Sequence, residues 1–301
     1  MGEPRFWSKG MEKELIIHGR PHLNSPWLIG GYEGWVDAGK VSSGSVTYLK
    51  DTLRARKFAE ILTDGFHHFK EFRPRVVVED GLLRQVDYPQ NEFFYWKNRE
   101  SRPDLILFIG QEPHFRWKAF VDLIVKLALR FGVQRLVTIG GLYDQVVHTI
   151  PRKISVVAGT PQMLEELLVH DVITIDYAGP GSHVSLLQEH CQADGIGSFM
   201  LWGRVPPYIK TSSPWDSIQI IELLSKLVPF EVDLRGLRAE AKLIDQELQK
   251  ALEEKPDLKT YVKQVESLQR SRHPGSAKSG DNVITIEAFL KNVDKGNKKE
   301  D

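Results

Sequence analysis

The stretch DLILFIGQEPHFRWKAFVDLIVKLALRFGVQRLVTIGG, residues 104–141, determines the class of fold. Residues 104–110 are almost continuously apolar, which is typical of a strand buried on both faces of a sheet. Residues 115–131 repeat apolar side chains at helical spacing, and Gly132 then ends the predicted helix. Residues 135–141 form a second apolar run. This order predicts a βαβ unit, whose two strands we expect to be adjacent, parallel and central.

The alternation of strands and helices continues on both sides of this unit. Upstream, strands are predicted at residues 27–32 and 75–79, with a helix at 38–56 between them. Downstream, Thr160 and Pro161 begin a helix as its N-cap and its first helical residue. The remaining predicted elements are strands at 153–158, 172–177 and 197–202 and helices at 182–193 and 213–227. The order indicates an α/β architecture with a mainly parallel sheet.

Composition divides the chain into four parts. Residues 1–14 are a polar tail, and residues 15–234 carry the α/β pattern. Residues 235–270 form a helical extension of two amphipathic helices, and residues 271–301 combine a flexible linker with a short terminal helix. Because a lone helix is marginal in water, we expect one apolar stripe of the extension to pack against the core or another subunit. That stripe consists of Leu237, Ile244, Leu248 and Leu252.

Charge and cysteine content argue against several classes of protein. The 40 basic and 40 acidic side chains give a net charge of zero, so no general affinity for nucleic acid or for an anionic membrane is expected. No apolar run approaches the roughly 20 residues that span a bilayer, and the charged N-terminus does not resemble a secretory signal. Cys191 is the single cysteine, so no internal disulfide can form. These features predict a cytoplasmic protein.

The candidate functional residues lie in loops that follow predicted strands, where open parallel sheets bind ligands. The first loop, residues 30–40, is glycine-rich but has neither the spacing of a dinucleotide-binding motif nor that of a P-loop. It contains Glu33 and Asp37, four residues apart, with Trp35 between them. The two carboxylates could share one face of a helical turn at a pocket. The simpler interpretation is that Asp37 caps the following helix.

Two further loops carry groups with catalytic potential. In the first, Glu112 and Arg116 are predicted to pair across one helical turn above Trp117, although Arg116 could instead bind an anion. In the second, Asp144 and His148 could act as an orienting carboxylate and a general base. No serine or cysteine nucleophile is near them in sequence, so a chance neighbourhood is the simpler interpretation.

A last loop, residues 201–209, adds Arg204 and aromatic residues to this set. The sequence contains neither the HExxH spacing of a zinc site nor a G-x-S-x-G elbow, and Cys191 is expected to be structural. The residues alone therefore assign no catalytic group, no metal and no cofactor. The candidate pocket rim consists of Glu33, Trp35, Asp37, Glu112, Arg116, Trp117, Asp144, His148 and Arg204.

A family resemblance is carried by five ordered segments: LIGGYEGWVDAG, FRPRVVVEDGLLRQVDYP, FIGQEPHFRWKAF, LVTIGGLYDQVVHT and SFMLWGRVPPYI. Together they resemble the proteasome assembly chaperone 2 family of bacteria and archaea, over roughly residues 15–235. The resemblance implies a three-layer α/β/α sandwich of the phosphorylase/hydrolase-like type, homo-oligomers, and an ATP-independent chaperone or proteasome adaptor. Family members that dock on the proteasome end in a hydrophobic-Tyr-x motif, whereas this sequence ends in Lys298, Lys299, Glu300 and Asp301.

Two functions remain open from the sequence. The first is a non-enzymatic protein-binding role, with the chain itself and proteasome-like or other protein complexes as partners. The second is a small-molecule-binding or hydrolytic enzyme with a nucleoside phosphorylase-like ancestor, which would use the candidate rim. Convergence of the rim side chains in one pocket would favour the enzyme, and separate pairing would favour the protein-binding role.

Overall fold

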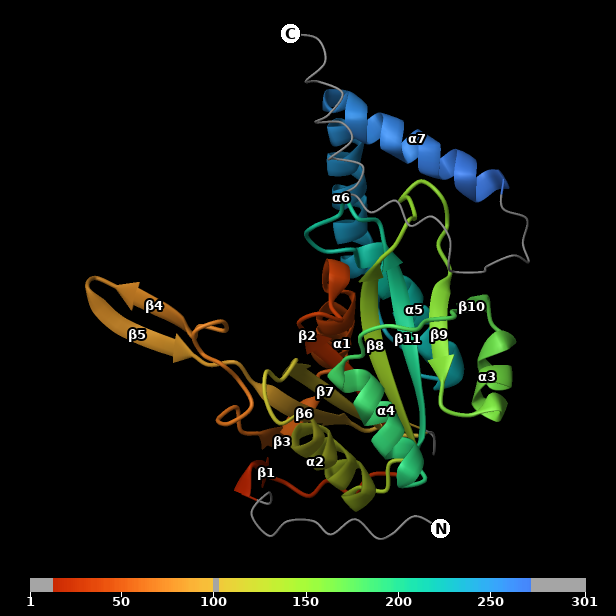
Figure 1. The fold of residues 1–301 in the computed structure, drawn as a ribbon. Coiled ribbons are helices and arrows are strands. Elements are labelled where there is room, and N and C mark those ends of the chain that lie inside the picture. The colour runs from red at the N-terminus through yellow and green to blue at the C-terminus, as the bar shows by residue number, and fades with distance from the viewer. Residues whose placement is uncertain (1–12, 100–102, 272–301) are drawn as a thin grey trace.

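The computed structural model describes residues 13–99 and 103–271, so most of the polar tail and the predicted linker and terminal helix lie outside the described residues. Within the described part, one nine-stranded sheet forms the centre and a two-stranded hairpin projects from it (Figure 1). The strand order in the large sheet is β1-β3-β6-β7-β2-β8-β11-β9-β10.

The bounds of the elements are as follows. The large sheet contains β1 (Leu15–Ile17), β2 (Trp27–Glu33), β3 (Arg56–Ile61), β6 (Asn91–Trp96), β7 (Leu105–Gln111), β8 (Arg135–Tyr143), β9 (Ile154–Ala158), β10 (Val172–Thr174) and β11 (Gly197–Val205). The hairpin contains β4 (Arg75–Glu79) and β5 (Leu82–Asp87). The helices are a 3-10 turn (Ala38–Lys40), α1 (Val41–Thr52), α2 (Trp117–Arg130), α3 (Pro161–Leu168), α4 (His183–Ala193), α5 (Pro214–Leu227), α6 (Arg235–Glu254) and α7 (Pro256–Ser271).

The four central strands, β7, β2, β8 and β11, run parallel, while β6 and β9 pair antiparallel with the outer two. The two strands of the predicted βαβ unit are therefore central and parallel, but they are not adjacent. Strand β2 lies between them, so that Ile29 pairs with Leu107 on one side and with Val137 on the other. The prediction of adjacency was wrong because an apolar pattern does not reveal whether a crossover helix passes over a third strand.

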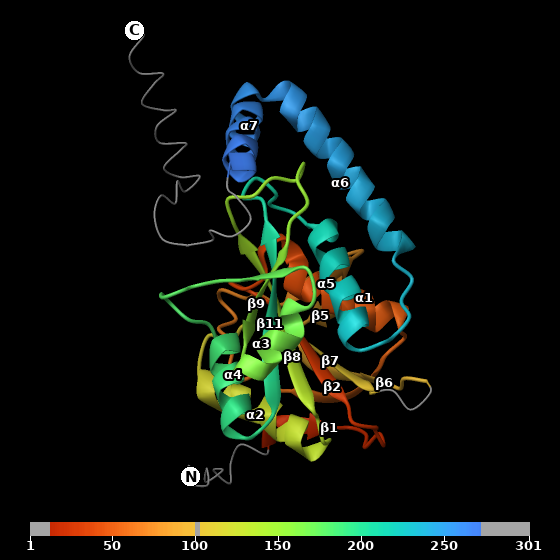
Figure 2. The same cartoon turned by 90° about the vertical axis from the view of Figure 1, so that its right-hand side faces the viewer.

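Helices cover both faces of the large sheet, which confirms the three-layer architecture. Helices α1, α3 and α5 contribute to the core on one face, and α2 and α4 to the core on the other (Figure 2). Neighbouring residues of β2 serve opposite faces, because strand side chains alternate. Ile29 belongs to the core with α1 and α5, whereas Leu28 and Tyr32 belong to the core with α2 and α4.

Three glycines allow the start of α1 to lie directly on the sheet. A Cβ atom at Gly141 of β8 would lie 2.2 Å from the carbonyl oxygen of Ala38, and one at Gly31 of β2 would lie 2.5 Å from that of Ser42. A Cβ atom at Gly203 of β11 would lie 2.9 Å from Val41 Cγ1. We call Gly31, Gly141 and Gly203 the glycine row. Each residue comes from a different segment of the family resemblance, so those segments share a packing role.

Several predicted elements differ from the structure, among them the helix at 38–56 and the strand at 75–79. Helix α1 ends at Thr52 instead of residue 56, because Arg54 adopts a left-handed backbone with φ of 52° and β3 begins at Arg56. The strand predicted at 75–79 is present as β4, but it pairs only with β5 and stays outside the large sheet. We call residues 75–87 the arm.

The helical extension forms two helices that meet at Pro256 (Figure 2). In α6, Leu237 is buried, whereas Ile244, Leu248 and Leu252 are half-buried. The predicted stripe is therefore covered fully at its start and partly along its length. Helix α7 buries Tyr261, Val262 and Val265 in a small core with Val147.

None of the helices in the described ranges combines the length and the apolarity that crossing a bilayer requires.

Candidate functional site

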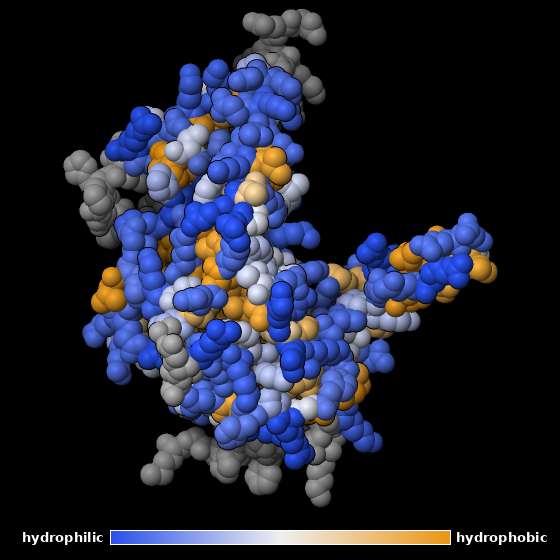
Figure 3. Space-filling view, turned by 180° about the vertical axis from the view of Figure 1, so that it is seen from behind, coloured by the Kyte–Doolittle hydropathy of each residue, from blue (hydrophilic) through white to orange (hydrophobic). Residues whose placement is uncertain are grey.

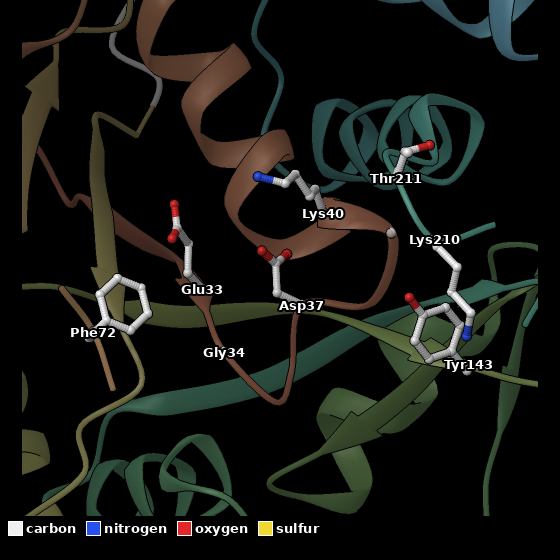
Figure 4. A pocket seen from close by; sticks show the side chains of 9 residues that line it. Glu33, Gly34, Asp37, Lys40, Phe72, Tyr143, Lys210 and Thr211 are labelled. Atoms are coloured by element: carbon white, nitrogen blue, oxygen red, sulfur yellow. The ribbon is translucent and has the colours of Figure 1, made fainter. Parts of the chain in front are cut away.

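A shallow pocket of about 250 Å³ lies at the C-terminal ends of β2 and β8. Its lining includes two acidic, two basic and two aromatic side chains, which come from four separate parts of the chain (Figure 4). These are Glu33, Asp37, Lys40, Phe72, Tyr143 and Lys210.

The pocket lies where the sheet topology changes direction. From β2 the chain leads through α1 to β3 on one side of the sheet, and from β8 it leads to β9 on the other. The two strands pair only from Trp27–Gly30 with Arg135–Thr138. Beyond that point Ser42 of α1 lies between them, where its hydroxyl accepts from Tyr32 N–H at 2.9 Å and donates to the Ile139 carbonyl. Such switch points are the usual ligand sites of open α/β sheets.

Asp37 has a structural role at this pocket. Its carboxylate accepts hydrogen bonds from the N–H of Ser43 at 3.0 Å and from the hydroxyl of Ser43 at 2.6 Å. These bonds hold the first turn of α1, as the capping interpretation predicted. Burial raises the pKa of Asp37 to about 6, although the bonds from Ser43 act in the opposite direction.

Three other charged residues line the pocket: Glu33, Lys40 and Lys210. Glu33 accepts a hydrogen bond from Gln111 Nε2 at 3.2 Å. Lys40 has a left-handed backbone, with φ of 51°, directly before α1. The ammonium group of Lys210 lies 4.5 Å from the centre of the Tyr143 ring, which is cation–π contact.

Glu112 is not among the residues that line the pocket. Its carboxylate accepts from the N–H of Trp35 at 2.7 Å and lies 3.5 Å from Nδ1 of His183. The Trp35 side chain itself is 64% exposed. Burial opposes ionisation of Glu112, but the contacts with His183 and Trp35 outweigh it and lower its pKa. Burial also lowers the pKa of His183, so the histidine is neutral at pH 7.

The predicted ion pair between Glu112 and Arg116 does not form. Arg116 instead pairs with Glu14, with Nη1 and Oε1 2.5 Å apart, and its guanidinium stacks on Phe66 at 4.9 Å. The prediction failed because it considered neighbours on one helical turn, whereas Arg116 precedes α2 with a left-handed backbone. Trp117 donates from Nε1 to the carbonyl of Pro113 at 2.6 Å.

Asp144 and His148 do not contact one another as a catalytic pair would. Asp144 accepts from Arg204 Nε at 2.7 Å. His148 Nδ1 lies 2.7 Å from the hydroxyl of Tyr208. Of the nine predicted rim residues, only Glu33 and Asp37 line the pocket. The other seven lie outside this lining, and Arg116, Asp144 and His148 each contact a different partner, which is the separate pairing expected of a protein-binding role.

Metal and thiol chemistry have little support in the described part of the chain. Within residues 13–99 and 103–271, no three side chains of His, Cys, Asp or Glu are arranged to hold a metal ion. Cys191 is buried, and this burial raises the pKa of its thiol to about 12. The thiol is therefore neutral and unreactive at physiological pH.

Four of the six side chains named above were not predicted from the sequence. Lys40 and Tyr143 lie in loops that the sequence did indicate, but neither belongs to a recognisable motif. Phe72 and Lys210 lie in other segments, and only the fold brings them to the pocket.

Comparison with known proteins agrees with the fold and with the resemblance. The sequence profile described as "PAC2 family" matches residues 31–252. A PAC2 family protein from Streptomyces avermitilis is 26% identical, with a TM-score of 0.71 over 79% of this chain and 99% of that one. A proteasome-assembly chaperone homologue from Mycobacterium tuberculosis is 25% identical, with a TM-score of 0.71 over 78% and 99%.

A more distant structure, an archaeal proteasome activator from Pyrococcus furiosus, is 21% identical and shares the fold, with a TM-score of 0.66 over 79% and 97% of the two chains. Among curated proteins, no match was found. Because the profile covers most of the chain, and the structure has the fold of family members, this chain belongs to the PAC2 family.

Proposed function

We propose that this protein is an ATP-independent chaperone or adaptor that works as an assembly of its own copies in the cytoplasm. Membership of the PAC2 family and the likeness to a proteasome-assembly chaperone homologue support a role in binding proteins. Proteasome components are the first partners to test, since that homologue is described by its role in proteasome assembly.

The observation that carries the proposal is the exposed apolar surface of the arm. Val76, Val78 and Leu83 expose 57%, 59% and 62% of their surface, and Val86 exposes 38%. The arm projects from the body as a two-stranded sheet, and apolar surface is visible along it (Figure 3). A two-stranded hairpin alone is marginally stable in water. The arm therefore needs a partner surface.

Four apolar residues of the arm share one face. Val76 pairs with Val86, and Val78 pairs with Leu83 across the hairpin. Since Val76 and Val78 are two residues apart on one strand, all four side chains point to the same side. The opposite face carries Arg75, Gln85 and Asp87 together with Val77 and with Leu82, which is 54% exposed. An apolar face rimmed by polar residues is typical of a protein-binding surface.

We infer that this face binds a second copy of the chain. A double substitution that keeps the hairpin intact tests the inference. In Val78→Glu/Leu83→Lys, opposite charges face each other across the strands, so the hairpin is supported while its apolar face is lost. The matched control is Val77→Glu/Gln85→Lys, because Val77 and Gln85 pair on the other face.

Light scattering measures the mass of each protein. We expect an oligomer for the native sequence and for the control, and a monomer for Val78→Glu/Leu83→Lys. A monomeric native protein, or loss of assembly in the control alone, would overturn the role of the arm. Suppression of the aggregation of a heat-unfolded enzyme, measured without ATP, tests the chaperone activity separately.

A further inference from the structure

The large sheet ends at strand β10. Among the described strands, β10 pairs only with β9, where Val172 lies opposite Ile154. Val172 and Ile173 are half-buried, and Thr174 is exposed. One side of β10 therefore presents main-chain N–H and C=O groups without a strand partner, and such an edge accepts a further strand.

The sequence of this edge strand occurs twice in the chain. Residues 172–175 and residues 283–286 both read Val-Ile-Thr-Ile, and an acidic residue follows each run, Asp176 in the first case and Glu287 in the second. All four side chains are β-branched, which is typical of strands. The second run lies outside the described residues, in the part of the chain where a linker and a short helix are predicted. Its side chains suit this sheet as well as those of β10 do.

Helix α7 ends near the start of this edge. Its last turns contact the loop that leads into β9, because Glu266 accepts from the hydroxyl of Thr149 and Gln269 Nε2 donates to the carbonyl of Gln145 at 3.2 Å. In two views α7 runs towards the side of the molecule that carries β9 (Figure 1 and Figure 2). Since β9 and β10 are parallel, the chain leaves α7 near the N-terminal ends of both strands.

The intervening chain is long enough to reach the edge. Residues 272–282 span at most about 40 Å when extended. The five residues from Thr149 to Ile154 account for at most about 18 Å, and the helical residues from Glu266 to Ser271 for about 8 Å. A strand beside β10 lies two strand spacings from β9, about 10 Å. These lengths together stay within the reach of the linker, which arrives at the end where a parallel strand must begin.

We propose that residues 283–286 bind the free edge of β10 as a parallel strand of the same chain. In register, Thr285 lies beside Thr174 on one face of the sheet and Ile284 beside Ile173 on the other, because both strands alternate in the same order. The added strand covers the half-buried side chains of β10 and pairs the main-chain groups of its edge.

The added strand closes the sheet against other chains, since an open edge is a template for association. It also ties the end of α7 to the sheet. The arm lies in the other half of the sheet, between β3 and β6 in sequence, so this contact is independent of the proposed function.

Disulfide trapping in the full-length protein tests the pairing. In Thr174→Cys/Thr285→Cys the two thiols lie on one face of neighbouring strands, at a Cα separation of about 4.8 Å that a disulfide can bridge. The matched control is Thr174→Cys/Ile284→Cys, whose second thiol points to the opposite face. Mild oxidation should give about tenfold more disulfide in the first variant than in the control. Cys191 is buried and does not compete.

Mass spectrometry shows whether the bond lies within one chain. A 174–285 disulfide in a protein of single-chain mass supports the proposal. A bond that forms only between two chains assigns the edge to a second copy and overturns the proposal. Equal yields in the two variants, or no bond in either, overturn it as well.

Hydrogen exchange measures the same contact without added thiols. Ile284→Pro removes a main-chain donor from the added strand, so the amides of residues 172–174 should exchange about tenfold faster or more. Lys278→Pro, in the linker, is the control and should leave their exchange unchanged. Exchange at the native rate in Ile284→Pro would show that the edge of β10 has no such partner.

Discussion

The Nδ1 atom of His183 lies 3.5 Å from Oε1 of Glu112, although the side chain of His183 is completely buried. His67 is buried as well, and burial is the main cause that lowers its pKa to about 4. Both histidines are therefore neutral in the folded state over a pH range in which an unfolded histidine takes up a proton. The stability of the fold should consequently depend on pH through His67 and His183, which do not line the pocket.

The first prediction concerns this pH dependence. A histidine with a lowered folded-state pKa contributes stability that is complete above pH 6.5 and is lost as the pH falls towards the folded-state value. Between pH 6.5 and 4, the unfolding free energy should fall by up to about 1.4 kcal/mol per pH unit for His67. Asp37 acts in the opposite sense. Its folded-state pKa is raised to about 6, so the folded form takes up a proton at a higher pH than the unfolded form, and this contribution to stability grows as the pH falls.

Urea unfolding of His67→Gln at several pH values measures this effect. The variant should show a shallower loss of stability between pH 6.5 and 4 than the native protein. His22→Gln, at an exposed position, is the control and should leave the slope unchanged. Parallel slopes for the native protein and His67→Gln would contradict the prediction.

The second prediction concerns the glycine row. Gly141→Ala places a methyl group where the Ala38 carbonyl lies, so it should destabilise the fold by about 1–3 kcal/mol or more. Gly44 is in α1 with its nearest contact at 3.9 Å, so Gly44→Ala should stabilise by up to about 1 kcal/mol through helix propensity. Thermal unfolding should thus shift in opposite directions for two chemically identical changes. A shift in the same direction would show that the row is not under steric constraint.

The third prediction concerns a buried ion pair. Arg152 donates from Nε and Nη2 to the two oxygens of Asp216 at 3.1 and 3.0 Å, and both side chains are almost fully buried. Arg152→Ala leaves the Asp216 charge buried with less compensation and should cost about 3–5 kcal/mol. Arg204→Ala breaks the more exposed pair with Asp144 and should cost about 1 kcal/mol or less. Denaturant midpoints compare the two, and equal losses would refute the argument from burial.

The fourth prediction concerns the attachment of the helical extension. Leu237 is buried in the core that α1 and α5 share, so Leu237→Ala should destabilise by about 2–5 kcal/mol. Leu243 lies on the same helix but is 61% exposed, and Leu243→Ala should change stability by less than about 0.5 kcal/mol. Calorimetry of both proteins tests the pair. A small effect at Leu237 would mean that α6 is held elsewhere.

The sequence predicted those parts of the fold that depend on local patterns. The apolar runs that became β7 and β8 and the helix between them followed from periodicity alone. The cap at Thr160 was confirmed, because its hydroxyl accepts from the N–H of Met163 at 3.3 Å. These features depend on contacts between residues close in sequence, so the sequence alone is enough to predict them.

The parts that failed depend on long-range contacts. Arg116 and Glu14 are separated by 102 residues, and nothing in either segment indicates their pairing. The position of β2 between β7 and β8 is likewise a property of topology. Likewise, the pocket collects Phe72 and Lys210 from segments without ligand motifs. Periodicity gives no information on which distant segments meet. Of the candidate rim, only Glu33 and Asp37 therefore lie at the pocket.

The glycine row has a consequence for how this family can vary over evolutionary time. At Gly31 and Gly141, the atoms that an added methyl group would meet first belong to the main chain, at Ser42 and Ala38. No second substitution can make a carbonyl group smaller, so neither position can be rescued by a compensating change in its neighbour. At Gly203 the nearest atom belongs to the Val41 side chain, which a smaller residue could replace. Gly203 is therefore less strictly constrained, although an added Cβ would also lie 3.1 Å from Asp216 Cβ, whereas Gly31 and Gly141 are fixed by the backbone itself.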